Sequence, residues 1–193
     1  MQVKVLQVGP IGTNCYLLED EKAHVAAVID PGDEAGRILQ VIKDDGVDVK
    51  YILLTHGHYD HTTAVPELHQ ALPQAEIYIH KADANGAGSR LFPLAGQIPD
   101  LKFYDEGVLH TPGHSKGSVT LKVGDVLFCG DTLFAGSCGR TDLAGGSYEE
   151  IMASLKKLGE LPGDYHVCPG HDVTSTLERE RRSNPFLREA MMH

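Results

Sequence analysis

The stretch THGHYDH, residues 55–61, places three imidazoles and a carboxylate within six positions. It begins at the end of YILLTH (51–56), a continuous apolar run that predicts a buried strand. No single helix or strand brings all four side chains to one face, because neither period matches their spacing. A turn from a strand into a helix can direct them to one point, and Gly57 gives such a turn its backbone freedom. Because clustered His and Asp suit zinc, iron or manganese, the stretch predicts a metal site.

Three later segments repeat this arrangement, in which a predicted strand runs into a glycine-containing turn that carries a His or an Asp. They are TPGHS (111–115), FCGDT (128–132) and CPGHD (168–172). One such turn alone says little, but sites in layered α/β proteins gather at the ends of several strands. We therefore expect His114, Asp131 and His171 to join the cluster at 56–61.

The order of predicted elements favours an α/β fold. Two blocks of strands, each followed by helices, predict two packed sheets with helices outside, in a single domain spanning 1–193. Residues 81–106 show no periodic pattern and are expected to form a surface loop. Strands are predicted at 3–8, 15–19, 25–30, 51–56, 76–80, 108–111, 118–123, 126–129 and 165–168. Helices are predicted at 33–45 with Asp33 as cap, from about 61 to 72, at 148–158 after Ser147, and through the charged tail at 176–192.

Composition excludes several kinds of partner. Lys and Arg number 17 and Asp and Glu number 27, and the formal charge of −10 disfavours nucleic-acid binding. No apolar run approaches the ~18 residues of a transmembrane helix, and no secretion signal is visible at the N-terminus, so no membrane partner is expected. The four cysteines form no CxxC pair, which predicts reduced thiols in a cytoplasmic protein. The sequence makes no prediction of oligomeric state.

Together, these motifs resemble the metallo-β-lactamase superfamily. The order His-x-His-x-Asp-His at 56–61, then His114, Asp131 and His171, is similar to that family's pattern over nearly the whole chain. VIDPG (28–32) matches the family's early aspartate turn. The resemblance implies an αββα sandwich of two mixed sheets flanked by helices, with a two-metal site at one edge.

The resemblance also implies a role for each ligand. Two divalent ions are expected as cofactors, zinc first, with iron and manganese as alternatives. Asp60 and Asp131 would be the catalytic carboxylates. With a shared hydroxide they would leave net positive charge for an anionic intermediate. In this assignment one ion takes His56, His58 and His114, the other takes Asp60, His61 and His171, and Asp131 bridges them.

Other residues are candidates for supporting roles. Asp30 and His110 are expected beside the ligands, which they would orient. Arg140 is a candidate for binding a substrate carboxylate, although a purely structural arginine fits equally well. Cys138 is expected near the site but not as a ligand, because the ligand set is already full. Arg179, Arg181 and Arg182 alternate with glutamates and are expected on a solvated helix face.

Within the superfamily the sequence resembles the glyoxalase II (hydroxyacylglutathione hydrolase) branch. The matching segments are IGTNCYLL (11–18), GDTLFAGSCGRTD (130–142) and PGHDVTSTLERERRSNPFL (169–187). This implies hydrolysis of a small acyl thioester such as S-lactoylglutathione through a metal-bound hydroxide. Longer members carry a C-terminal helical domain that helps to hold glutathione, whereas only residues 172–193 follow His171 here. We therefore expect weak dependence on the glutathione half.

Three alternatives remain open. SCGRTD (137–142) also resembles the persulfide dioxygenases of this superfamily, in which His56, His114 and Asp131 would hold a single iron. A lactone or ester hydrolase is the second alternative, because ester and thioester carbonyls make similar demands. A non-catalytic metal-binding module is the third, but structural zinc sites are usually closed by four ligands.

Overall fold

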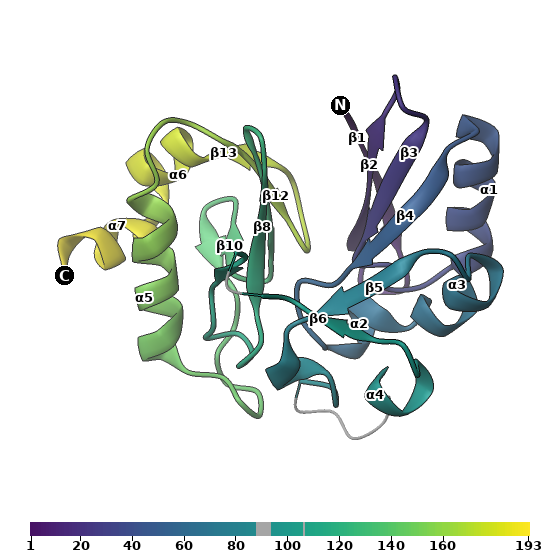
Figure 1. The fold of residues 1–193 in the computed structure, drawn as a ribbon. Helices are drawn as coiled ribbons and strands as arrows, with labels where there is room; N and C mark the ends of the chain where they lie inside the picture. The colour runs from purple at the N-terminus through teal and green to yellow at the C-terminus, as the bar shows by residue number, and fades with distance from the viewer. Residues whose placement is uncertain (88–93, 106) are drawn as a thin grey trace.

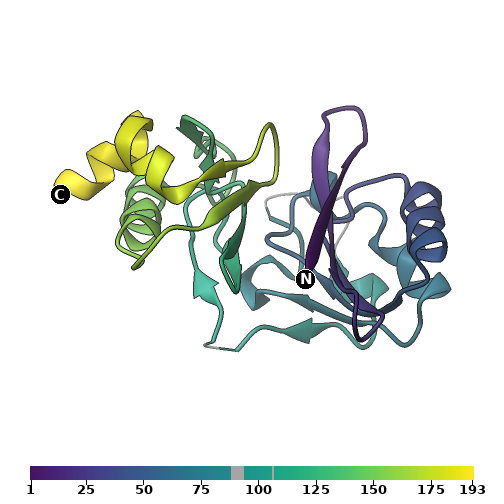
Figure 2. The same cartoon turned by 90° about the horizontal axis from the view of Figure 1, so that it is seen from above.

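The computed structural model describes residues 1–87, 94–105 and 107–193 (Figure 1). Its described strands form two main β-sheets that face one another, and helices cover the outer side of each (Figures 1 and 2). This layered arrangement confirms the αββα sandwich expected from the sequence.

The N-terminal sheet is mixed. Its first three strands are antiparallel, and the pairings β3–β4, β4–β5 and β5–β6 are parallel. Helices α1 (Ala35–Asp45) and α3 (Val65–Ala71) cover its outer face (Figure 1). In sheet order the strands are β1 (Gln2–Val8), β2 (Thr13–Asp20), β3 (Val25–Ile29), β4 (Asp48–Leu53), β5 (Glu76–Ile79) and β6 (Lys102–Phe103).

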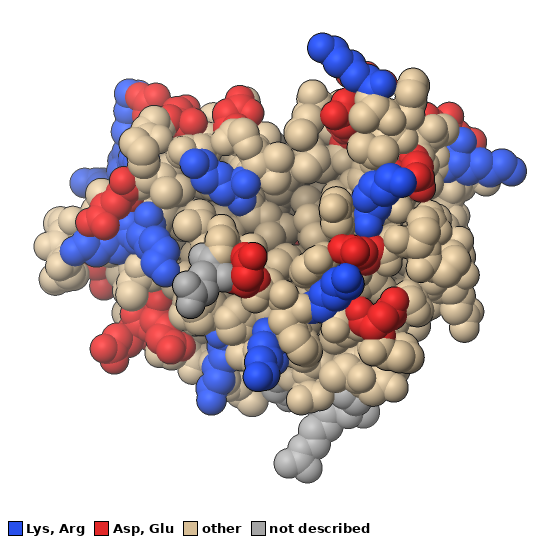
Figure 3. All heavy atoms as spheres, viewed as in Figure 1, with Lys and Arg blue, Asp and Glu red and all other residues tan. Residues whose placement is uncertain are grey.

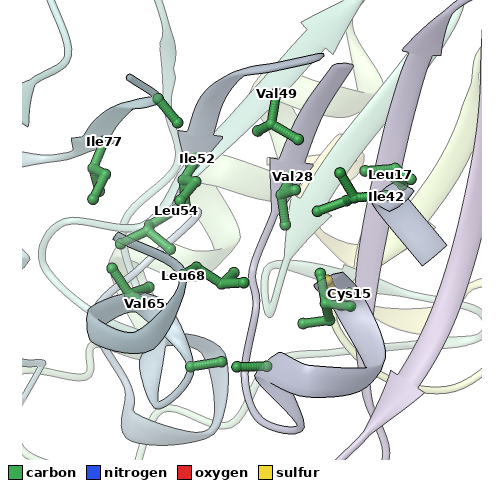
Figure 4. Close-up of a cluster of buried hydrophobic side chains, with 14 of the residues drawn as sticks. Cys15, Leu17, Val28, Ile42, Val49, Ile52, Leu54, Val65, Leu68 and Ile77 are labelled. Carbon is green, nitrogen blue, oxygen red and sulfur yellow. The ribbon is translucent and has the colours of Figure 1, made fainter. Parts of the chain in front are cut away.

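Apolar side chains fill the space between this sheet and its helices (Figure 4). Ile42 of α1 and Leu68 of α3 pack into the cluster that contains Val28 and Ile52 of the central strands. Leu68, Val28 and Ile52 are fully buried. Burying a side chain of this size contributes roughly 1.5–3 kcal/mol, so the cluster fixes both helices on the sheet.

Helix α1 begins one residue later than its expected cap implies. Asp33 accepts a hydrogen bond from the Glu34 amide, and Glu34 takes the N-cap position in a left-handed conformation with φ 55°. The expected cap at Asp33 is therefore wrong, because its side chain bonds to the adjacent amide rather than to the first helical turn. The helix ends as predicted at Gly46, whose φ is 64°.

The second sheet is also mixed, since β12 and β9 are parallel and the other pairings are antiparallel. Helix α5 (Tyr148–Gly159) covers it, and the Ser147 hydroxyl caps this helix as predicted. The tail forms two helices, α6 (Leu177–Ser183) and α7 (Pro185–Met192), because Asn184 caps the second one directly before a proline. In sheet order the strands are β13 (Ser175–Thr176), β12 (His166–Pro169), β9 (Val126–Gly130), β8 (Val119–Val123) and β7 (Leu109–His110).

The region predicted as a loop at 81–106 contains regular structure in its described part. A 3₁₀ helix, η1 (Lys81–Asp83), and a short helix, α4 (Leu94–Gln97), precede β6, which pairs with β5. The rest of that prediction, at 88–93 and 106, lies outside the described residues. The hairpin of β10 (Leu133–Phe134) and β11 (Ser137–Cys138) was also not predicted.

On the face drawn in Figure 3, acidic and basic side chains are interspersed over both halves of the molecule. Among the helices of the described ranges, none is long and apolar enough to cross a membrane.

Candidate metal centre

The predicted ligands converge on one point from loops that follow four different strands. The loop after β4 leads into the short helix α2 (Tyr59–Thr62) and carries the cluster at 56–61. The other ligands follow β7, β9 and β12. Ligand-type atoms within each of two groups lie within 4.8 Å of one another: His56, His58 and His114 form the first group, and Asp60, His61, Asp131 and His171 form the second.

The Asp131 carboxylate lies between the two groups. Its Oδ2 is 3.3 Å from His114 Nε2 in the first group and 3.4 Å from His171 Nε2 in the second. Its Oδ1 is 3.3 Å from His61 Nε2. This is the position that a carboxylate shared by two metal ions would take.

The donor set fits divalent metal ions. Tetrahedral zinc with bonds of ~2.0–2.1 Å holds its ligand atoms roughly 3.3–3.4 Å apart, and the separations from Asp131 to His61, His114 and His171 match this spacing. His56 Nε2 and Asp131 Oδ1 are buried without a hydrogen-bond partner in the described structure. A buried polar atom without a partner costs about 1–3 kcal/mol, and bound cations would satisfy both.

Asp30 holds one ligand in a fixed orientation. Its carboxylate accepts hydrogen bonds from the Thr55 amide at 2.8 Å and the Thr55 hydroxyl at 2.6 Å. Its Oδ2 lies 3.0 Å from His61 Nδ1, so the other nitrogen of that ring faces the cluster. The backbone of Asp30 is left-handed, with φ 52°, which turns the chain at the end of β3. Asp30 therefore has the contacts expected of a residue that orients a ligand.

His110 lies elsewhere. Its ring stacks on His80, with 4.4 Å between centroids, and its Nε2 is 2.8 Å from the carbonyl of Lys116. It lines a separate cavity of about 560 Å³. Successive side chains of a strand point to opposite faces, and here the buried Thr111 faces inward while His110 is exposed. None of the contacts described for His110 is with a ligand.

Arg140 lines the cavity that the ligands also border, and its guanidinium is already paired. It makes two hydrogen bonds with Asp142, at 2.7 and 2.8 Å, and both side chains are exposed. The Arg140 carbonyl lies 2.8 Å from His114 Nδ1, so its backbone orients that ring.

Cys138 lines the same cavity, and burial raises the pKa of its thiol to about 11. It is therefore a neutral thiol at physiological pH.

The C-terminal arginines make contacts away from the ligands. Arg181 donates to the carbonyl of Gly159, the last residue of α5, and to the carbonyl of Gly163 just after it. Arg182 pairs with Glu178. The described contacts of this cluster thus support a structural role at the helix surface.

Sequence reasoning missed Asp83, which is buried between two ligand-bearing loops and accepts a hydrogen bond from the Gly57 amide. It lies in the unpatterned segment at 81–106, and no motif there distinguishes it. The sequence identifies Gly170 only as a turn residue, whereas in the structure a side chain at this position would overlap the Asp131 carboxylate.

The histidines divide into two electrostatic classes. Burial lowers the pKa of His56 and His58, which favours neutral rings. Burial acts in the same direction on His61 and His171, but nearby Asp131 and Asp60 outweigh it. These carboxylates raise the pKa of His61 well above its usual range and that of His171 to about 9. In the metal-free protein, the positive charges of protonated His61 and His171 therefore offset the negative charges of Asp60 and Asp131.

This division predicts how the metal-free protein responds to pH. A histidine whose pKa is higher in the folded state stabilises the fold below its ordinary pKa of 6.5, and this stabilisation is lost as pH rises through about 9. We expect the Tm of chelator-treated protein to fall between pH 6.5 and 9, whereas metal-loaded protein, with a cation in place of those protons, keeps its Tm. Thermal unfolding of both forms across this range measures the difference. The metal-free His171→Gln variant should show a shallower decline, and a flat profile for the metal-free parent would contradict the prediction.

Residues 8–171 match the profile of the metallo-beta-lactamase superfamily. The chain therefore belongs to the metallo-beta-lactamase superfamily, as the order of its ligand motifs indicated. It is a hydrolase of that superfamily, with a metal-binding cluster of histidines and aspartates.

More specific similarities follow from individual proteins. The chain is 36% identical over 210 residues to the hydroxyacylglutathione hydrolase GloC of Haemophilus influenzae, covering 97% of this chain and 98% of that protein. It superposes on the BLEG-1 B3 metallo-beta-lactamase with a TM-score of 0.86 at 32% identity, covering 96% and 99% of the two chains. The TM-score to TTHA1623 in a di-iron-bound form is 0.83 at 38% identity, with coverages of 95% and 99%. These similarities confirm the fold and the glyoxalase II-like resemblance.

Proposed function

We propose that this protein hydrolyses small acyl thioesters at a two-metal centre, with S-lactoylglutathione as the first substrate to test. The observation that carries the proposal is the position of Asp131 between two complete ligand groups. The similarity to a hydroxyacylglutathione hydrolase along nearly the full length of both chains supports it. Bound divalent ions would lower the pKa of a water molecule and polarise a carbonyl group.

The chain's own residues shape where a substrate can lie. A cavity of about 570 Å³ opens over Asp131 and is lined by His58 and His114 from one group and by Asp60 and His171 from the other. A carbonyl bound in this cavity would therefore lie within reach of both groups. The apolar side chains of Ile11, Tyr59, Phe134 and Leu143 form much of the remaining wall.

Metal analysis combined with four assays tests the proposal. We expect two ions per chain, with zinc first, together with hydrolysis of S-lactoylglutathione. A single iron with oxygen uptake on glutathione persulfide would instead identify a dioxygenase. Hydrolysis of a lactone or of a β-lactam without thioester turnover would identify a different carbonyl substrate, and the similarity to a metallo-beta-lactamase makes the β-lactam assay necessary. Two-metal protein without thioester turnover would refute the proposal.

The cavity wall predicts weak selection for the glutathione half. Arg140 is the single Lys or Arg among the described residues of this wall, and Asp142 already pairs with it. A remote part of a substrate increases the rate only where the enzyme contacts it. We expect a high KM for S-lactoylglutathione and a kcat/KM within about tenfold for the lactoyl thioester of N-acetylcysteamine, a short uncharged thiol. A loss beyond about a hundredfold, roughly 2.7 kcal/mol, would reveal a specific glutathione site.

We also propose a cytoplasmic location. All four cysteines are free, and three of them are buried, which suits a reducing compartment.

A further inference from the structure

A buried carboxylate outside the ligand set connects the loops that supply the first ligand group. Asp83, at the end of η1, is 1% exposed. Its Oδ2 accepts hydrogen bonds from the Gly57 amide at 2.9 Å and from the Ser115 hydroxyl at 2.6 Å. Its Oδ1 accepts one from the Gly117 amide at 2.7 Å. One side chain is thus bonded to two loops that lie far apart in the sequence.

These two loops carry all three histidines of the first group. Gly57 is flanked by His56 and His58, and Ser115 directly follows His114. Any movement of Asp83 would therefore shift the three rings relative to one another. The second group has a different anchor, because Asp30 orients His61 through a contact of 3.0 Å.

Close packing makes this connection stiff. A Cβ atom added at Gly57 would lie 2.5 Å from the Asp83 carbonyl, and one added at Gly117 would lie 2.6 Å from its carboxylate. Both loops therefore approach Asp83 more closely than any residue with a side chain would allow. Ser118 supports the arrangement, since its hydroxyl lies 2.6 Å from that of Ser115.

We propose that Asp83 is a positioning residue that sets the geometry, and hence the metal affinity, of the site formed by His56, His58 and His114. All three of its partners donate hydrogen bonds, so both oxygens must accept, which a carboxylate does and an amide cannot. This role depends on the metal centre and not on the identity of the substrate.

The Asp83→Asn variant tests the proposal directly. The amide keeps the shape of the side chain, but its NH₂ group would face a donor from one of the two loops. We expect affinity for one of the two ions to fall about 10- to 100-fold, the usual effect of losing a partner that orients metal ligands. The second ion should bind as in the parent protein. Zinc titration of metal-free protein against a chromogenic chelator measures both affinities, and His58→Ala identifies which step belongs to the three-histidine site.

Glu180→Gln provides a matched control. Glu180 is also 1% exposed and accepts hydrogen bonds from the Gly136 amide, the Ser175 hydroxyl and the Asn184 side chain. The Glu180→Gln substitution should lower the stability of the fold without changing the affinity for either ion. Ser115→Ala removes only one donor and should give a smaller loss at the same site, which keeps the test available if Asp83→Asn does not fold.

Two results would overturn the proposal. One is parent-like affinity for both ions in Asp83→Asn. The other is equal weakening of both ions in Asp83→Asn and Glu180→Gln, which would indicate general destabilisation. Because the readout is metal binding, failure of this inference is distinct from failure of the proposed thioester hydrolysis.

Discussion

Replacing Asp131 with alanine is expected to remove both high-affinity metal-binding steps and to lower kcat/KM by at least about 10³-fold, roughly 4 kcal/mol. Asp131 contacts His114 in one ligand group and His61 and His171 in the other. Without its carboxylate, two cations would face each other at close range in a partly buried site, where their repulsion is weakly screened. Metal content after dialysis and thioester kinetics measure the two effects.

His114→Ala is the comparison variant for this experiment. His114 belongs to one group only, so its loss should disturb mainly the ion held with His56 and His58. If Asp131→Ala kept both ions and near-normal turnover, the bridging assignment would be wrong.

Gly170→Ala is expected to reduce kcat/KM by about a hundredfold, roughly 2.7 kcal/mol, in a protein that still folds. A Cβ atom at this position would overlap Asp131 Oδ1 and lie 2.7 Å from His61 Cε1. The backbone cannot easily retreat, because the Gly170 amide donates to Gly130 and its carbonyl accepts from Asn14, both at 2.8 Å. The methyl group would therefore displace the carboxylate.

Gly36→Ala is the matched control. Gly36 lies in α1, and an added Cβ atom there would meet nothing within 4 Å. Its kinetics and metal content should equal those of the parent protein. Normal turnover in Gly170→Ala would contradict the prediction, because it would show that the site works with the Asp131 carboxylate displaced.

The parts of the site that could be predicted are those encoded within a few consecutive residues. His58 and Asp60 stand in one short motif, and His114 and Asp131 each stand in a glycine-containing turn after a strand. Because strand ends in a layered fold meet at one edge, local patterns were enough to bring these residues together.

The parts that could not be predicted depend on contacts between distant segments. Asp83 is separated by 26 residues from Gly57 and by 32 from Ser115, and two of its three partners are backbone amides that leave no trace in side-chain patterns. His110 was expected beside the ligands, but its described contacts are with His80 and Lys116. The face toward which a strand residue points depends on the register of its strand, and the sequence pattern of a two-residue strand such as β7 does not indicate that register.

The fold shows the same division. Helices α1 and α5 were predicted because apolar residues recur along them at helical spacing, as Ile38 and Ile42 do in α1. Strand β6 has only two residues and is defined by its pairing with β5. No local sequence pattern predicts this pairing.

The origin of the ligands has a consequence for how the molecule would come apart. The cluster at 56–61 extends from the N-terminal sheet, whereas His114, Asp131 and His171 extend from the second sheet. Each sheet has its own apolar cluster beneath its helices, and a smaller cluster that includes Tyr16 and Phe128 lies between them. Bound ions would thus link the two sheets across the interface between them. Chelation should loosen this interface first, with faster amide hydrogen exchange at residues that face the opposite sheet. The amides in the apolar cluster between each sheet and its own helices should remain protected.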